Sequence, residues 1–181
     1  RIIRARNEEL PTGKRMSNLE GPFRVWVVLK KLMKREGRQP DDMNATGGYV
    51  YGQGVVNTVM SLDLVTMRYT TLAPMITARR YHATAVLDGK LFVMGGSNGG
   101  YTSLSSVECL DLETGQRSAM APMITPRGCH GAAVLGGKIY VAGGSPVSTV
   151  GTLVECFDAA TNQWTAVAPM NTRRCWHGLV S

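Results

Sequence analysis

Cysteine is scarce in this sequence, with only four in 181 residues. That number is too small for a disulfide-stapled scaffold of this size, and we expect reduced thiols in a cytoplasmic protein. Long apolar runs are also missing, since no segment approaches the roughly 18–20 apolar residues that span a membrane. The longest apolar patch near the N-terminus, 25–29, is shorter than the signal-peptide core of about 7–15 residues. The sequence therefore predicts no membrane partner.

Positive charge is unevenly distributed along the chain. Residues 1–45 hold 11 Lys and Arg against 6 Asp and Glu, whereas the remaining residues hold 9 against 7. The formal net charge of +7 therefore lies mostly in the first quarter of the chain, and the glycine-rich body is nearly neutral. Nucleic-acid binding domains typically carry basic residues across the domain, and the body of this sequence does not. We expect no nucleic-acid partner.

The N-terminal segment 1–46 matches no repeat. Pro22 precedes a stretch, 23–35, whose apolar positions and basic C-terminal end predict a short amphipathic helix. A solvated linker or a helix that packs on the body is favoured. Contact with a membrane surface or a nucleic acid is the alternative.

The body of the chain repeats with a spacing of 47 or 48 residues. The recurring features are a Gly-Gly doublet, an Ala-Pro-Met triplet, an arginine four residues after that methionine, a histidine seven residues after it, and an aspartate before a turn. They fall at Gly47-Gly48, Gly95-Gly96 and Gly143-Gly144; Met75, Met123 and Met170; Arg79, Arg127 and Arg174; His82, His130 and His177; and Asp63, Asp111 and Asp158. Such a period indicates stacked supersecondary units.

Each full unit contains four strand-like segments. In one unit they are 82–87, 90–94, 106–111 and 117–121, with turns at 88–89 and 113–115 and a polar loop at 97–104. The next unit has 130–135, 138–142, 153–158 and 164–168. Four short strands in about 48 residues are the pattern of a β-propeller blade.

The unit resembles a kelch repeat. The resemblance lies in Arg-x-x-His-x-x-Ala-Val-Leu, Gly-Lys-Ile-Tyr-Val-x-Gly-Gly, Val-Glu-Cys-Phe-Asp-x-x-Thr-Asn-Gln-Trp and Ala-Pro-Met, and it covers 47–181. It is greatest to the kelch-like proteins that carry BTB and BACK domains upstream. The resemblance implies an all-β, kelch-type β-propeller fragment.

The units depart from the repeat in two places. Residues 41–46 hold no aromatic side chain and only one β-branched side chain, Thr46, which is unlike a strand that leads into a doublet, so the first unit is expected to be incomplete. The position of Trp164 holds Tyr69 in the first unit and Arg117 in the second. We expect two full four-stranded blades, 82–121 and 130–168, a partial blade at 47–75, and the start of another at 177–181.

The repeated residues are interpreted as structural. The glycines allow close backbone approach, and a nucleotide-binding loop is disfavoured because strands rather than a helix follow them. The histidines recur without a carboxylate or cysteine at ligand spacing, so no metal is expected. The recurring Arg79, Arg127, Glu108 and Glu155 predict ion pairs between blades. Cys109 and Cys156 share one repeat position, which favours packing.

Two loop families open on one face of the propeller and hold residues that do not repeat. One follows the Gly-Gly doublet and the other follows the repeated arginine. In kelch-like proteins this face receives a peptide of the partner, and the resemblance extends to the contact positions there. The candidate binding residues are Arg80, Tyr81, Ser97, Asn98, Tyr101, Ser145 and Trp176. Arginine and aromatic residues are typical of binding hot spots, although generic solvated loops are the alternative for each.

The resemblance implies a non-enzymatic protein-interaction scaffold. The favoured function is the substrate-recognition propeller of a cullin-RING ubiquitin ligase adaptor, with a peptide ligand at the loops and a cullin bound through upstream domains. An actin-binding scaffold is the first alternative. A galactose-oxidase-like or sugar-epimerase propeller is the second, but it requires Tyr, Cys and His at non-repeating positions. We expect no catalytic residue and no cofactor.

Overall fold

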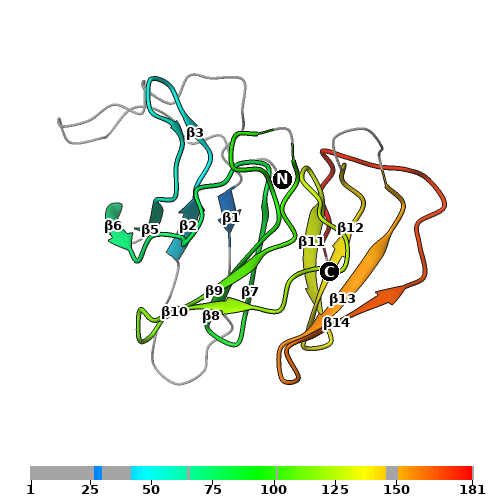
Figure 1. The fold of residues 1–181 in the computed structure, drawn as a ribbon. Coiled ribbons are helices and arrows are strands. Elements are labelled where there is room, and N and C mark those ends of the chain that lie inside the picture. The colour runs from blue at the N-terminus through cyan, green and yellow to red at the C-terminus, as the bar shows by residue number, and fades with distance from the viewer. Residues whose placement is uncertain (1–26, 30–41, 65, 101, 146–150, 181) are drawn as a thin grey trace.

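The described part of the chain folds into three four-stranded antiparallel sheets and one small hairpin (Figure 1). The computed structural model describes residues 27–29, 42–64, 66–100, 102–145 and 151–180. No helix occurs within these ranges. We call the three sheets blades 1, 2 and 3, in chain order.

Each blade contains four strands that pair with their neighbours. Blade 1 consists of β1 (Val27–Leu29), β2 (Asp42–Thr46), β5 (Val59–Asp63) and β6 (Arg68–Leu72). Blade 2 consists of β7 (Ala83–Leu87), β8 (Lys90–Met94), β9 (Val107–Asp111) and β10 (Arg117–Met120). Blade 3 consists of β11 (Gly131–Leu135), β12 (Lys138–Ala142), β13 (Val154–Asp158) and β14 (Gln163–Val167). The hairpin joins β3 (Tyr49–Val50) to β4 (Gly54–Val55).

The blades lie side by side, and the strands β7 and β11 contact each other (Figure 1). The short turns of blades 2 and 3, such as Asp88-Gly89, lie at one end of the strands. The loops after the Gly-Gly doublets and the connections between blades lie at the other end, which we call the loop face. The predicted four-strand unit is therefore confirmed for blades 2 and 3.

The predicted helix at 23–35 is wrong where the structure describes it. Val27–Leu29 form β1, which pairs antiparallel with β2, and the rest of the predicted helix lies outside the described residues. Val27 and Val28 are β-branched, so a strand suits them once a partner is available. In blade 1, β1 occupies the place that β7 has in blade 2.

The prediction that the first blade lacks the strand before Gly47 is also wrong. Residues 42–46 form β2, which pairs along its full length with β5. The side chains of Asn44 and Thr46 are buried, and Thr46 Oγ1 lies 2.8 Å from His82 Nε2. Pairing with β5 and contact with blade 2 therefore outweigh the poor strand propensity of this segment.

Residues 177–180 do not form the predicted start of a further strand. They lie beside β11, because a Cβ placed on Gly131 would be 2.9 Å from Leu179 Cβ. A strand requires a hydrogen-bonded neighbour, and none of the described segments pairs with these residues. Residue 181 lies outside the described part of the chain.

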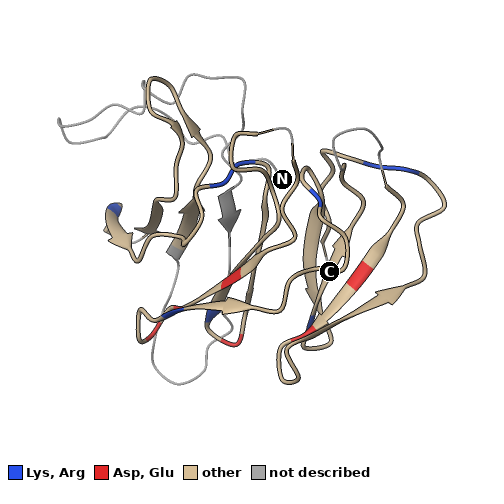
Figure 2. Ribbon diagram, in the orientation of Figure 1, with Lys and Arg blue, Asp and Glu red and all other residues tan. Residues whose placement is uncertain are grey.

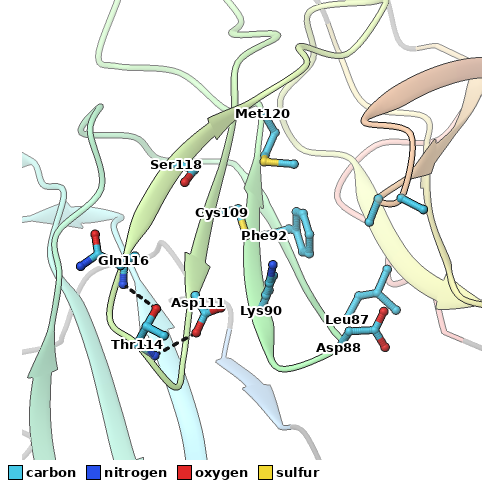
Figure 3. Close-up of a pocket in the computed structure, with 12 residues that line it drawn as sticks. Leu87, Asp88, Lys90, Phe92, Cys109, Asp111, Thr114, Gln116, Ser118 and Met120 are labelled. Carbon is cyan, nitrogen blue, oxygen red and sulfur yellow. Dashed lines mark hydrogen bonds between the residues drawn. The ribbon is translucent and has the colours of Figure 1, made fainter.

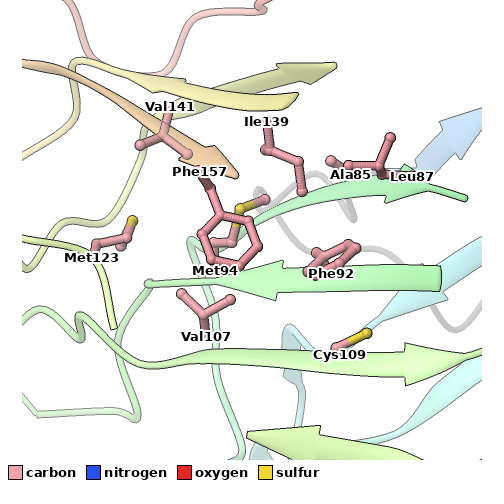
Figure 4. Close-up of a cluster of buried hydrophobic side chains, with 10 residues drawn as sticks. All are labelled: Ala85, Leu87, Phe92, Met94, Val107, Cys109, Met123, Ile139, Val141 and Phe157. Atoms are coloured by element: carbon pink, nitrogen blue, oxygen red, sulfur yellow. The ribbon is translucent and has the colours of Figure 1, made fainter. Parts of the chain in front are cut away.

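The core consists of two layers, one between each pair of adjacent blades. Leu91 and Val93 of β8 pack toward blade 1. Phe92 and Met94 pack toward blade 3 (Figure 4). Side chains alternate between the two faces of a strand, so both faces of blade 2 are buried. Phe92 meets Phe157 of blade 3 edge to face, with ring centroids 5.8 Å apart. Phe92 therefore fills the space between blades 2 and 3.

No helix in the described ranges has the length and apolar character that crossing a membrane requires.

Candidate functional site

The repeated glycines, methionines, arginines and histidines belong to one contact that joins successive blades. A Cβ on Gly95 would lie 2.4 Å from the carbonyl oxygen of Arg127 and 2.9 Å from Cε1 of His130. Gly47 and Gly143 have the same surroundings one blade earlier and one blade later. All three glycines also have positive φ. A side chain would block this approach, so the structural interpretation of the doublets is confirmed.

The repeated arginines form buried ion pairs with the repeated glutamates. Arg79 Nη2 lies 2.6 Å from Glu108 Oε1, and Arg127 Nη2 lies 2.5 Å from Glu155 Oε1. Glu108 also accepts hydrogen bonds from the backbone N–H groups of the connection at 76–77. Figure 2 shows the acidic positions midway along β9 and β13. The predicted pairs therefore tie each connection to the blade that follows it.

Trp164 and Arg117 make the same hydrogen bond although they differ chemically. Trp164 Nε1 donates to the carbonyl oxygen of Ala121 at 2.9 Å. Arg117 Nη2 donates to the carbonyl oxygen of Ala73, the equivalent residue one unit earlier, at 2.7 Å. Arg117 also lies 3.5 Å from Glu108. The residue at this position differs between the units, but its hydrogen bond to the preceding blade is the same.

The histidines pack against the glycine doublets in the interior. Burial lowers the pKa of His82 to about 4, with a further contribution from Arg79. Burial lowers the pKa of His130 to about 3, and Arg127 adds to the effect. No group of three or more metal-ligating side chains gathers in the ranges that the structure describes. His82 and His130 are therefore neutral near pH 7 and pack against the glycine doublets.

These buried histidines make stability sensitive to mild acid. The unfolded chain binds protons near pH 6.5, whereas the folded histidines resist protonation until much lower pH. The free energy of unfolding should therefore be constant above pH 6.5 and fall by about 1–2 kcal/mol per histidine between pH 6.5 and 5. Urea unfolding at several pH values measures this slope.

The variant His130→Asn serves as the control for this slope. It should remove one titrating group and reduce the pH dependence between pH 6.5 and 5. Asp111 and Asp158 do not add to the slope between pH 6.5 and 5, because their pKa values are lowered. Hydrogen bonds lower the pKa of Asp111, and the bond from Lys138 lowers the pKa of Asp158. An unchanged slope in the variant would show that buried His130 does not couple protonation to unfolding.

At the loop face, the backbone joins the two predicted loop families. Arg80 and Ser97 exchange two hydrogen bonds, with N···O distances of 2.9 and 2.8 Å. Gly128 and Ser145 make the equivalent bridge in blade 3. The loop after the doublet and the loop after the arginine therefore lie side by side at the loop face.

The connections also form a hydrogen-bonded row across the loop face. Cys129 N–H donates to the carbonyl oxygen of Tyr81, and Trp176 N–H donates to that of Cys129, each at 2.8 Å. These three residues occupy one repeat position, and all have positive φ, between 56° and 61°. The left-handed backbone disfavours non-glycine residues, and the row of hydrogen bonds holds it in place.

Arg80, Tyr81 and Trp176 form a cluster at this face. The rings of Tyr81 and Trp176 meet edge to face with centroids 5.0 Å apart. The Arg80 guanidinium lies 4.8 Å from the Tyr81 ring centroid and 5.8 Å from that of Tyr49. Trp176 and Tyr49 are each about half exposed, at 53% and 47%. We call these four residues the arginine–aromatic cluster.

Sequence reasoning missed Tyr49. It follows the doublet Gly47-Gly48 directly, in the place that Ser97 and Ser145 have in the later units. Its position after the doublet could therefore have identified Tyr49, but the first unit was expected to be incomplete. Tyr49 extends the candidate site onto the β3–β4 hairpin.

The remaining candidates have different surroundings. The Ser97 hydroxyl donates to the carbonyl oxygen of Gly100 at 2.9 Å, which stabilises its own loop. Asn98 is exposed beside it. Ser145 accepts a hydrogen bond from Ser103 Oγ through its backbone carbonyl. Tyr101 lies outside the described residues. Ser97 and Ser145 thus shape the loops, and the cluster provides the large exposed side chains.

A pocket of about 350 Å³ lies between blades 2 and 3, away from the loop face (Figure 3). Phe92, Cys109 and Met120 form its apolar side, and Lys90 and Asp111 lie near the strand ends. Burial raises the pKa of the Cys109 thiol. None of the candidate binding residues lines this pocket.

Three stacked four-stranded blades joined by these repeated contacts define a kelch-type β-propeller. The match to a family model supports this class: residues 38–180 match the KLHDC2/KLHL20/DRC7 Kelch-repeats domain. The chain belongs to this kelch-repeat family. A search among curated proteins found no match. Kelch-repeat domains are typical protein-binding propellers.

Proposed function

We propose that the loop face binds a short segment of a partner protein. The observation that carries the proposal is the arginine–aromatic cluster, in which Arg80 is held over Tyr81 and beside Tyr49 next to the half-exposed Trp176. Arginine and aromatic side chains contribute most of the energy in many interfaces. A surface that is already ordered loses little conformational entropy on binding.

The charge of Arg80 indicates which partner the face favours. Its guanidinium donates hydrogen bonds in a planar fork that matches a carboxylate. The flanking rings provide apolar surface for a neighbouring side chain of the partner. A peptide that combines an acidic residue with an apolar one therefore suits this cluster best.

Binding is tested by selecting peptides on the purified chain and measuring affinity by fluorescence anisotropy. We expect Arg80→Ala and Trp176→Ala each to raise Kd by at least about tenfold, since a hot-spot residue contributes more than about 1.4 kcal/mol. Lys138→Ala is the matched control, because Lys138 is exposed at the opposite end of blade 3. Unchanged affinity in both cluster variants would contradict the proposal.

We further propose that the protein acts in the cytoplasm as the substrate-recognition propeller of a cullin-RING ubiquitin ligase adaptor. The support is the resemblance of the repeats to those of kelch-like proteins. The test is co-purification of a cullin with the protein expressed from its own gene in cells. Binding should persist in Arg80→Ala, because the cullin contact lies upstream of the propeller. Failure to recover any cullin would reject the adaptor role and leave peptide binding intact.

A further inference from the structure

Two thiols lie in adjacent connections on the loop face. Cys129 is in the connection that enters blade 3, and Cys175 is in the connection that leaves it. Both are partly buried and neither is in a disulfide. Their hydrogen-bonded segments are in direct contact, because Trp176 N–H donates to the carbonyl oxygen of Cys129 at 2.8 Å.

The equivalent pair of residues one unit earlier gives the distance expected between the Cβ atoms of these two cysteines. Cys129 occupies the position of Tyr81, and Cys175 occupies that of Gly128, one unit earlier. A Cβ placed on Gly128 would lie 3.6 Å from Tyr81 Cβ. The backbone hydrogen bond beside this pair is also 2.8 Å, as it is beside the two cysteines. The relation between the connections is therefore the same at both places.

This geometry fits a disulfide. A disulfide requires Cβ atoms about 3.5–4.5 Å apart, and the repeat places those of Cys129 and Cys175 near the lower end of that range. We propose that Cys129 and Cys175 form a reversible disulfide across the loop face when the protein meets hydrogen peroxide. Cys109 and Cys156 lie in different blades and stay reduced.

The order of the two steps follows from the environment of Cys129. Burial, with a contribution from the nearby Cys175, raises the pKa of Cys129 to about 11, so its thiolate is scarce at neutral pH. The Cys175 thiolate attacks one peroxide oxygen and the O–O bond breaks. The sulfenic acid forms, and the leaving hydroxide becomes water by taking up the proton that Cys175 released. The Cys129 sulfur then attacks the Cys175 sulfur, and the sulfenic hydroxyl leaves as water with the Cys129 proton. Two thiols are oxidised and one peroxide is reduced to two waters.

The disulfide would act next to the arginine–aromatic cluster, since Cys175 precedes Trp176 and Cys129 accepts its backbone hydrogen bond. The chemistry of the thiols does not depend on a partner. The inference therefore stands or falls separately from the proposed binding function.

Peptide mapping tests the inference on the full chain. The protein is treated with hydrogen peroxide, blocked with an alkylating reagent under denaturing conditions and digested with trypsin. The four cysteines fall in four different tryptic peptides, 91–117, 128–138, 139–173 and 175–181. We expect a linked pair of 128–138 and 175–181 that dithiothreitol separates, with alkylated thiols in the other two peptides. Alkylated or over-oxidised Cys129 and Cys175 without a link would overturn the inference, as would links to Cys109 or Cys156.

Two variants sharpen the test. Cys175→Gly copies the residue found at the equivalent position of the preceding connection, so the fold should tolerate it, and it should abolish the link. In that background, the pair Tyr81→Cys and Gly128→Cys moves the two thiols one blade earlier. The same treatment should then link residues 81 and 128. Absence of that link in a folded protein would show that the repeat geometry does not support a disulfide.

Discussion

Replacement of Arg127 by alanine is expected to lower the free energy of unfolding by about 3–5 kcal/mol. The Arg127 side chain is 2% exposed, and its guanidinium bonds to Glu155 and to the carbonyl oxygens of Gly143 and Leu153. Its removal leaves the Glu155 carboxylate buried without its counter-charge. Urea unfolding measures the loss, which corresponds to a fall in Tm on the order of 10 °C.

The matched control is Lys138→Ala. Lys138 pairs with Asp158 at 3.0 Å, but the two side chains are 47% and 33% exposed. An exposed pair contributes at most about 1 kcal/mol, so this variant should unfold almost as the original protein does. Similar stability losses for Arg127→Ala and Lys138→Ala would contradict the expectation that burial makes the repeated ion pair contribute more to stability than an exposed pair.

Gly95→Ala should destabilise the protein by about 2–5 kcal/mol. The backbone at Gly95 has φ of 62°, which costs an alanine about 1–2 kcal/mol. The new Cβ would also lie 2.4 Å from the Arg127 carbonyl oxygen and 2.8 Å from Met123 Cε. Relief of that clash requires blades 2 and 3 to move apart, and overpacking of this kind costs about 1–3 kcal/mol more. Thermal and urea unfolding both report the change.

Gly115→Ala separates the two contributions. Gly115 has φ of 72° but no atom within 4 Å of the position of a Cβ. This variant should therefore lose only the conformational part, about 1–2 kcal/mol. Equal losses at Gly95 and Gly115 would contradict the close approach of the connection to the glycine doublet.

The sequence predicts blades 2 and 3 well because their signals are local and periodic. The Asp88-Gly89 turn, the alternating strand residues and the doublet at Gly95 all lie within one unit, and each agrees with the others. The ion pairs were predictable for the same reason, since Arg127 and Glu155 recur at a fixed offset in successive units.

Blade 1 was harder to predict because its strands depend on distant partners. Apart from the β-branched Thr46, no residue of Asp42–Thr46 favours a strand. Pairing with β5 and the contact between Thr46 and His82 produce it. Val27–Leu29 likewise becomes a strand only when it pairs with β2. Strand propensity is a weak guide where such non-local contacts decide the outcome.

By itself, the sequence determined the class of fold and the structural role of the glycines and histidines. A residue that must be the same in every unit leaves a period, and a period is visible without coordinates. Only the tertiary structure placed Tyr49 beside Arg80 and set Cys175 against the connection that holds Cys129. These residues differ from unit to unit and come from separate loops, so their neighbours are set by how the blades stack.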